Sequence, residues 1–202
     1  MSTLHCLNHP WFQLKFLSVS PLAQLVPPAG RSDLDLILER VGVFRSWPAG
    51  ARNPDRLPQL RAYLAMPGRG PRSRFCDGSF RVVYAGGTQA TCSAEVAHHH
   101  GQALRDSGEP PGAARIFELL ALRTAGQVQD VRTDHPDLGR PDDYRPAQAF
   151  GAACKSAGEA GILYASRRRP GGRCLAILDG GLVKTCGLRE VVALRWDGER
   201  LA

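Results

Sequence analysis

The chain has 202 residues, of which 43% are hydrophobic, and this suits one globular domain with a sizeable core. Lysine and arginine total 26 against 19 acidic residues, and arginine carries almost all of the net charge of +7. This surplus favours phosphates, nucleic acids or carboxylates as partners, although the codon bias of a GC-rich genome explains it equally well. Because no long apolar run occurs, the sequence predicts neither an export signal nor a membrane span.

The first thirty residues end in a cluster of helix and strand breakers, Val26–Gly30. We therefore expect residues 1–30 to be an extension of uncertain order, and residues 31–202 to form the domain. Behind Ser32, apolar residues at helical spacing predict a helix over 33–41 that stops at Gly42. A short strand is expected over 44–47.

The middle of the chain alternates predicted helices and strands. A short helix between loops is expected over 57–66, a strand over 80–85 and a helix over 90–104. Two strands follow, over 115–123 and 128–131.

The last third predicts a helix over 144–157, capped by Asp142 or Asp143. Strands are expected over 162–165, 174–178 and 191–196, and the Pro170–Gly172 turn joins the first two into an antiparallel hairpin. Together these elements predict a mixed α+β domain.

Three polar residues on successive elements form the first candidate site: Arg74 in a loop, Tyr84 at a strand end and Glu95 on a helix. Tyr84 precedes Gly86-Gly87, where the backbone can approach a ligand. Glu95 lies among alanines, so an inward carboxylate would need a partner such as Arg74. Each residue also has an ordinary explanation, as a strand aromatic or a solvated helix residue.

A second candidate follows the strand over 162–165, where Ser166 precedes the arginines Arg167 to Arg169. Such a cluster can bind phosphate, although a solvated arginine loop looks the same. No G-x-S-x-G motif supports a serine nucleophile.

Metal and classical nucleotide sites find little support. Consecutive histidines on a helix point in different directions, so His98, His99 and His100 cannot share one ion; we expect a polar helix surface, with His98 and His99 on the side of Glu95. Six scattered cysteines match no zinc spacing and predict a reduced, cytoplasmic protein. Neither the Rossmann nor the Walker glycine motif occurs.

Several of these motifs, taken in order, resemble the RES domain, a family named for Arg, Glu and Ser. The resemblance spans roughly residues 43–180 and rests on the following segments: Arg74-Phe75, the strand ending in Tyr84, Thr91–Glu95, Asp142–Tyr144 with Ala147–Ala149, Leu163–Ser166 and Arg169–Ala176. The chain departs from the family at Cys76–Gly78, where many relatives have Asn-Pro, and at Ala165, where proline is common.

The resemblance implies an ADP-ribosyltransferase-like fold with a twisted, mostly antiparallel sheet and flanking helices. It implies a bacterial toxin that acts on NAD⁺ and is neutralised by an Xre-type antitoxin, through which alone it would meet nucleic acid. Arg74 would bind a phosphate, Tyr84 would stack on the nicotinamide or its ribose, and Glu95 would hold ribose hydroxyls. Ser166 would bond phosphate or the carboxamide, and Arg167 would assist with phosphate.

The expected reaction is cleavage of the nicotinamide–ribose bond, preferably by phosphorolysis to nicotinamide and ADP-ribose 1″-phosphate. NAD⁺ is then substrate and inorganic phosphate co-substrate, with no resident cofactor or metal. Hydrolysis of NAD⁺, ADP-ribosylation of a host protein, and a non-enzymatic basic module that binds nucleic acid or protein stay as alternatives. The sequence leaves the oligomeric state open, a homodimer included.

Overall fold

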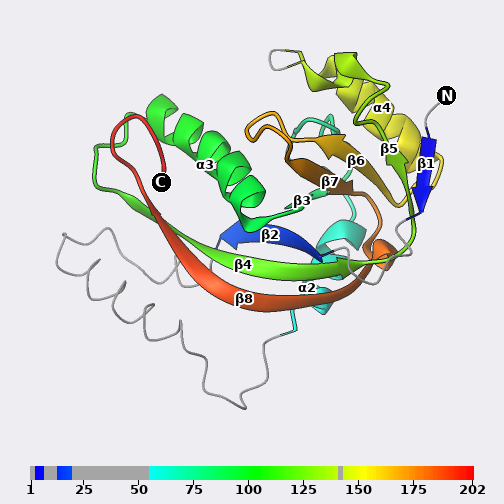
Figure 1. The fold of residues 1–202 in the computed structure, drawn as a ribbon, viewed down its shortest axis with the longest axis horizontal. Coiled ribbons are helices and arrows are strands. Elements are labelled where there is room, and N and C mark those ends of the chain that lie inside the picture. The colour runs from blue at the N-terminus through cyan, green and yellow to red at the C-terminus, as the bar shows by residue number, and fades with distance from the viewer. Residues whose placement is uncertain (1–2, 7–12, 20–54, 141–142) are drawn as a thin grey trace.

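A computed structural model describes residues 3–6, 13–19, 55–140 and 143–202. Its centre is a strongly curved, eight-stranded sheet with helices on both faces (Figure 1). The strand order is β1-β5-β6-β7-β3-β2-β4-β8, and every neighbouring pair is antiparallel except β5 and β6. The predicted α+β class and the mostly antiparallel sheet are thereby confirmed. The helix expected over 33–41 and the strand expected over 44–47 lie outside the described residues.

The elements have the following bounds. The strands are β1 (Thr3–Cys6), β2 (Gln13–Val19), β3 (Val83–Gly86), β4 (Ala114–Thr124), β5 (Gln127–Asp130), β6 (Gly161–Ala165), β7 (Arg173–Ile177) and β8 (Val183–Arg195). The helices are α2 (Leu57–Ala65), α3 (Gln89–Asp106) and α4 (Arg145–Ser156), with the 3₁₀ turns η2 (Pro136–Gly139) and η3 (Gly180–Leu182). None of the described helices is both long and apolar enough to cross a membrane.

The sheet consists of two halves that are barely joined. Strands β2 and β3 are paired at a single position, Lys15 opposite Gly86. By contrast, β2 pairs with β4 over seven residues and β3 with β7 over four. The half β1-β5-β6-β7-β3 and the half β2-β4-β8 therefore separate along most of this boundary.

Strand β4 has a different helix on each of its faces, because successive strand residues point to opposite sides. Leu120 and Leu122 pack in one core cluster with Leu60 of α2, whereas Phe117 and Leu119 belong to another cluster with Leu104 of α3. Figure 1 shows α3 above β4, whereas α2 overlaps β4 and β8 in this view. Helix α4 covers the other half of the sheet, through a third cluster that includes Ala147 and Ile162.

Helix α3 starts directly after β3, and local chemistry explains the sharp turn. Thr88 caps the helix by accepting a hydrogen bond from the Thr91 amide through its hydroxyl, at 3.1 Å. Gly86 lies so close to the first turn that a Cβ there would come within 2.8 Å of the Cys92 nitrogen. The turn fixes α3, which carries Glu95, against the end of the strand that carries Tyr84.

The N-terminal segment differs from expectation. Residues 1–30 were expected to be an extension outside the domain, yet β1 and β2 from this segment both pair with strands of the sheet. The apolar residues around β2 are interrupted by Gln13 and Lys15, so they resemble a linker more than a strand in the sequence. Strand β2 forms by pairing with β4, which lies about a hundred residues later in the sequence.

Other differences concern the ends of elements. Strand β8 starts at Val183 rather than at residue 191, and pairs with the whole of β4 around a bulge near Leu119. The strand predicted over 80–85 starts at Val83. Tyr144 occupies the N-cap of α4 without a side-chain cap, and Asp143 instead accepts a hydrogen bond from the Arg145 amide. The predicted hairpin of β6 and β7 is confirmed.

Candidate active site

A large cavity lies beside the boundary between the two halves of the sheet. Its volume is about 1490 Å³, larger than the roughly 300–1,000 Å³ typical of sites for small molecules. Its walls include Glu95 and the three histidines of α3, Tyr84 of β3, and Leu60 and Tyr63 of α2. Because α2 and α3 cover opposite faces of the sheet, the cavity extends from one face to the other beside β3.

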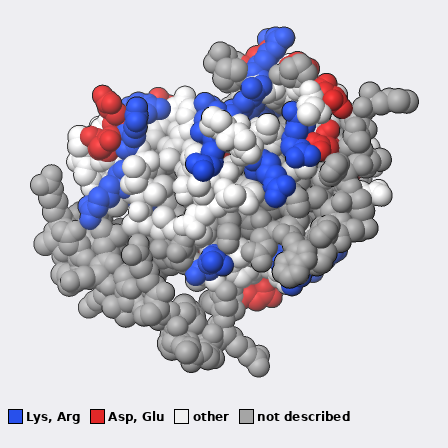
Figure 2. Space-filling model, in the orientation of Figure 1, with Lys and Arg blue, Asp and Glu red and all other residues white. Residues whose placement is uncertain are grey.

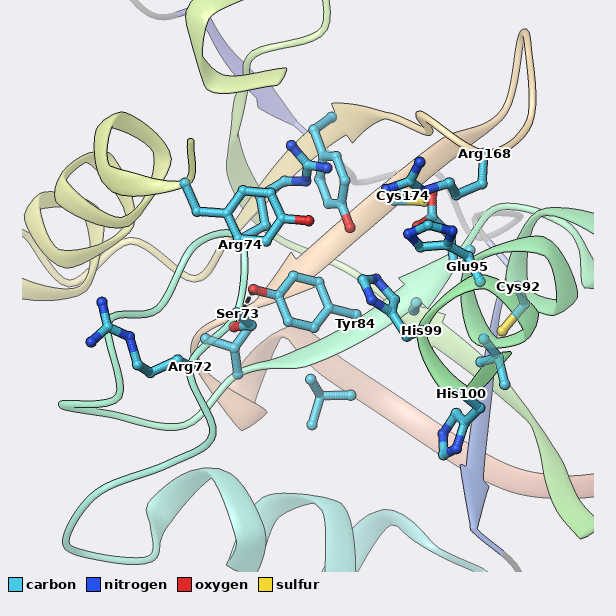
Figure 3. Close-up of a pocket in the computed structure, with 18 of the residues that line it drawn as sticks. Arg72, Ser73, Arg74, Tyr84, Cys92, Glu95, His99, His100, Arg168 and Cys174 are labelled. Carbon is cyan, nitrogen blue, oxygen red and sulfur yellow. Dashed lines mark hydrogen bonds between the residues drawn. The ribbon is translucent and has the colours of Figure 1, made fainter. Parts of the chain in front are cut away.

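Glu95 and Ser166 are in direct contact although 71 residues separate them in the sequence. The Ser166 hydroxyl donates a hydrogen bond of 2.6 Å to Oε1 of Glu95. The Cys174 thiol lies 3.9 Å from the same oxygen, and burial raises the pKa of that thiol to about 12, so it stays protonated. Figure 3 shows Glu95, Cys174 and Arg168 together at one side of the pocket. The carboxylate is thus fixed by neutral donors.

Ser166 uses all of its hydrogen-bonding capacity. Its hydroxyl gives its proton to Glu95 and accepts the amides of Arg168 and Arg169 at 3.2 and 3.1 Å. A hydroxyl offers one donor and two acceptor positions, so none is left for a ligand in this arrangement. Ser166 is only 9% exposed and lies behind Glu95. This geometry suits positioning of the carboxylate better than the expected contact with phosphate or carboxamide.

Tyr84 lies at the centre of the pocket, with its hydroxyl tied to the loop that carries Arg74. The hydroxyl accepts the Phe75 amide at 3.0 Å and shares a hydrogen bond of 2.8 Å with the Ser73 hydroxyl (Figure 3). Burial raises the pKa of Tyr84 to about 12, although these hydrogen bonds act in the opposite direction. The phenol therefore stays neutral and joins β3 to the loop. The ring of Tyr164 meets that of Tyr84 edge-on, with centroids 6.4 Å apart.

Arg74 is held by backbone carbonyls and an aromatic ring. Its Nη1 donates to the carbonyl oxygen of Leu138 at 3.2 Å, and its guanidinium carbon lies 4.9 Å from the ring centroid of Tyr144. Gln148 of α4 supports the same loop by donating to the Ser73 carbonyl at 2.9 Å. The sequence suggested Arg74 as one possible partner for an inward Glu95, but no ion pair joins the two within the described residues. Arg74 remains available to an anion in the cavity.

Of the arginines that follow Ser166, Arg168 lines the cavity and Arg167 does not. Arg167 packs on the outside against Gly139, where an added Cβ would collide with its guanidinium group. The sequence suggested Arg167 as a phosphate-binding residue, but the neighbouring Arg168 is the one that lines the cavity. Basic side chains gather over the β6–β7 hairpin on the face seen in Figure 2.

The cavity carries a surplus of positive charge. Arg56 and Arg145 on its wall form ion pairs with Glu118 and Asp143. The other lining arginines are Arg72, Arg74 and Arg168, and none of them has a carboxylate partner among the described residues. They face one remaining acidic residue, Glu95. The cavity therefore favours an anionic ligand that has a cationic or electron-poor centre near Glu95.

His98, His99 and His100 all line the cavity, so more of the histidine run faces it than the sequence indicated. Desolvation lowers the pKa of all three imidazoles, and neighbouring arginines or histidines add to this effect, whereas Glu95 opposes it at His98 and His99. The imidazoles are therefore neutral at pH 7. The described residues contain no group of His, Cys, Asp and Glu side chains suited to hold a metal ion.

The sequence missed several residues of the site. Ser73, Tyr164 and Gln148 lie on three different elements and meet around Tyr84 or its loop. No spacing rule reveals contacts of this kind. Gln148 and Tyr164 lie in segments that supported the resemblance, which was the one available signal.

Comparison with known proteins identifies the domain. The family model of the RES domain matches residues 48–197. No curated protein matches the chain. Among solved structures, the chain is similar to one in the crystal structure of the M. tuberculosis MbcT-MbcA toxin-antitoxin complex, with 21% sequence identity and a TM-score of 0.46. That match covers 65% of this chain and 78% of the other.

Proposed function

The chain belongs to the RES domain family, and from this premise we propose that it consumes NAD⁺ by cleaving the bond between nicotinamide and ribose. The observation that carries the proposal is the fixed carboxylate of Glu95, hydrogen-bonded to Ser166 in a cavity where three arginines have no carboxylate partner among the described residues. NAD⁺ combines a cationic nicotinamide ribose with an anionic pyrophosphate, and the cavity offers charges of the opposite sign to both.

Glu95 would stabilise the transition state of bond cleavage. Nicotinamide leaves as a neutral molecule, and positive charge then develops on the anomeric carbon and ring oxygen of the ribose. A carboxylate that is already oriented stabilises such an oxocarbenium ion without reorganisation. Ser166 would act as a positioning residue through its bond of 2.6 Å to Glu95.

The arginines and tyrosines would bind the rest of the substrate. Arg74 and Arg168 line the cavity, have no carboxylate partner in the part of the chain that the structure describes, and are suited to bidentate contacts with phosphate oxygens. The neutral rings of Tyr84 and Tyr164 also line the cavity and offer an aromatic wall to the nicotinamide.

Phosphorolysis is the preferred form of the reaction. The carbon–nitrogen bond breaks with its electron pair moving to nicotinamide, and an oxygen of inorganic phosphate bonds to the anomeric carbon to give ADP-ribose 1″-phosphate. The surplus of arginine supplies a place for this second anion, whereas hydrolysis needs only water. The same NAD⁺ site would also serve transfer of ADP-ribose to a protein.

Depletion of NAD⁺ would make the protein a toxin to its own cell. We therefore propose a cognate antitoxin as partner, one that covers the cavity until it is degraded. The family membership supports this proposal, and the basic surface over the β6–β7 hairpin offers such a partner a charged contact.

The decisive experiment incubates the purified protein with NAD⁺, with and without inorganic phosphate, and identifies the products by mass spectrometry. Phosphate-dependent release of nicotinamide supports phosphorolysis, and phosphate-independent release means hydrolysis. Release only when a protein acceptor is present means transfer. No release under any of these conditions, from protein that thermal unfolding shows to be folded, would overturn the proposal.

A further inference from the structure

The cavity has a second end, on the opposite side of the sheet from Glu95. It is lined by Leu60 and Tyr63 of α2, Ala85 of β3, and Glu118 and Leu120 of β4. The proposed chemistry takes place near α3 and leaves this end without a role.

Glu118 interrupts an otherwise apolar strand face. Leu120 and Leu122 lie on that face and belong to the core cluster under α2, and the next position on the same face is Glu118. Glu118 is 7% exposed, so its carboxylate is withdrawn from solvent. A buried carboxylate is costly unless its oxygens are bonded, and a leucine here would continue the core.

The ion pair at Glu118 is incomplete on both sides. Nη2 of Arg56 lies 3.0 Å from Oε1 of Glu118. The other oxygen, Oε2, accepts no hydrogen bond from the described residues, and the buried Nε of Arg56 has no partner. Glu118 lines the cavity, so an oxygen that lacks a partner among the described residues indicates a ligand that donates a hydrogen bond.

The walls around this pair are suited to a flat aromatic ring. Leu60, Ala85 and Leu120 are apolar, and the ring of Tyr63 is stabilised by the guanidinium group of Arg81 at 5.1 Å from its centroid. Adenine offers an exocyclic amine as donor, which complements the carboxylate of Glu118.

We propose that this end of the cavity, built by Tyr63, Arg56 and Glu118, binds the adenine of the dinucleotide and selects it against purines that carry a carbonyl at position 6. The inference rests on the proposed action on NAD⁺. The dinucleotide then extends through the gap in the sheet, with its nicotinamide near Glu95 and its adenine near Glu118. In the same orientation a carbonyl at position 6 places an acceptor opposite the carboxylate, and the base must shift to present its N1–H instead, which weakens binding.

The test compares NAD⁺ with nicotinamide hypoxanthine dinucleotide, which differs in that single group. We expect kcat/KM of the wild type to be roughly tenfold or more higher for NAD⁺ than for the analogue. Leaving a buried acceptor without a hydrogen bond lowers binding of the analogue by about this factor. Glu118→Gln, whose amide can donate to the carbonyl, removes most of the preference. Glu109→Gln, which removes an ion pair with Arg115 on the surface, leaves it unchanged. An equal preference in wild type and Glu118→Gln overturns the proposal.

Direct binding separates this proposal from the proposed reaction. Titration calorimetry with adenosine and inosine monophosphates needs no turnover, so it decides the question even if no nicotinamide is released. Preferred binding of the adenosine nucleotide by the wild type, lost in Glu118→Gln, supports the site; equal binding of both nucleotides, or of neither, contradicts it. Should Glu118→Gln fail to fold, Tyr63→Leu replaces it and must weaken binding of both nucleotides relative to Glu109→Gln.

Discussion

The Ser166 hydroxyl lies 2.6 Å from Oε1 of Glu95 and donates its only proton to it. The contact joins the end of β6 to the middle of α3, and it orients a carboxylate that forms no ion pair with an arginine among the described residues. The two residues act as a unit, in which Glu95 faces the cavity and Ser166 holds it in place. Substitutions at the two positions should therefore have related but unequal effects.

Glu95→Gln should reduce nicotinamide release from NAD⁺ by about a hundredfold or more, because the amide keeps the shape but lacks the charge that stabilises the transition state. The measurement is kcat with saturating NAD⁺, with thermal unfolding as a check of the fold. Glu109→Gln is the matched control. Near-normal turnover in Glu95→Gln would exclude the carboxylate from catalysis.

Ser166→Ala should be milder, with kcat lowered roughly tenfold and KM changed little, because Glu95 loses one hydrogen bond but keeps its charge. Ser166→Thr keeps the hydroxyl and should restore part of the activity. A loss as large as that of Glu95→Gln, or a change in KM alone, would mean that the serine contacts the substrate itself.

Arg168→Ala should raise KM for NAD⁺ about tenfold, whereas Arg167→Ala should leave it nearly unchanged, because only Arg168 lines the cavity. The neighbouring residues form a matched pair of equal charge. Initial rates at low and physiological salt measure the difference. A larger increase in KM for Arg167→Ala than for Arg168→Ala would mean that Arg167 binds the anion.

Gly151→Ala should destabilise the protein by about 1–3 kcal/mol, which is typical of overpacking. A Cβ at this position would overlap the carbonyl oxygen of Phe75, so α4 must move away from the loop that carries Arg74. Affinity for NAD⁺ should fall as well. Urea unfolding measures the first effect, with exposed Ala153→Ser on the same helix as control, and unchanged stability would contradict the packing.

Lowering the pH from 7.5 to 5 should reduce the melting temperature. Desolvation keeps the pKa of His100 below 6.5 in the folded state, so the unfolded chain binds more protons across this range and gains stability relative to the folded one. Asp143, with a pKa of about 2, acts only at lower pH. His100→Gln should make the melting temperature less sensitive to pH between 7.5 and 5, and an unchanged slope would exclude this histidine.

Elements with strong local signals were predictable from the sequence. Helix α3 and the β6–β7 hairpin follow from an uninterrupted helical segment and from the Pro170–Gly172 turn. Strand β2 and the first half of β8 were missed, because their residues alternate poorly and their order depends on pairing with distant β4.

The candidate site, like the fold, was predictable from the sequence only in part. Arg74, Tyr84, Glu95 and Ser166 were predictable as residues because they lie in motifs that resemble a known family. Their contacts were not, since Ser166 meets Glu95 only after β6 and α3 pack together. Whether Arg167 or Arg168 points into the cavity depends on how the turn after Ser166 folds. Because both residues are arginines, the sequence does not show which of the two side chains points inward.

The single pairing of Lys15 with Gly86 bears on how the domain unfolds. In a continuous sheet each strand protects the next, so opening at one edge is resisted by every ladder behind it. Here that protection is interrupted in the middle, and the two halves can lose their hydrogen bonds separately. A dinucleotide that extends through the gap would touch both halves, so the substrate itself would supply the cohesion that the backbone lacks. Hydrogen exchange should then slow on both sides of the gap when the ligand binds.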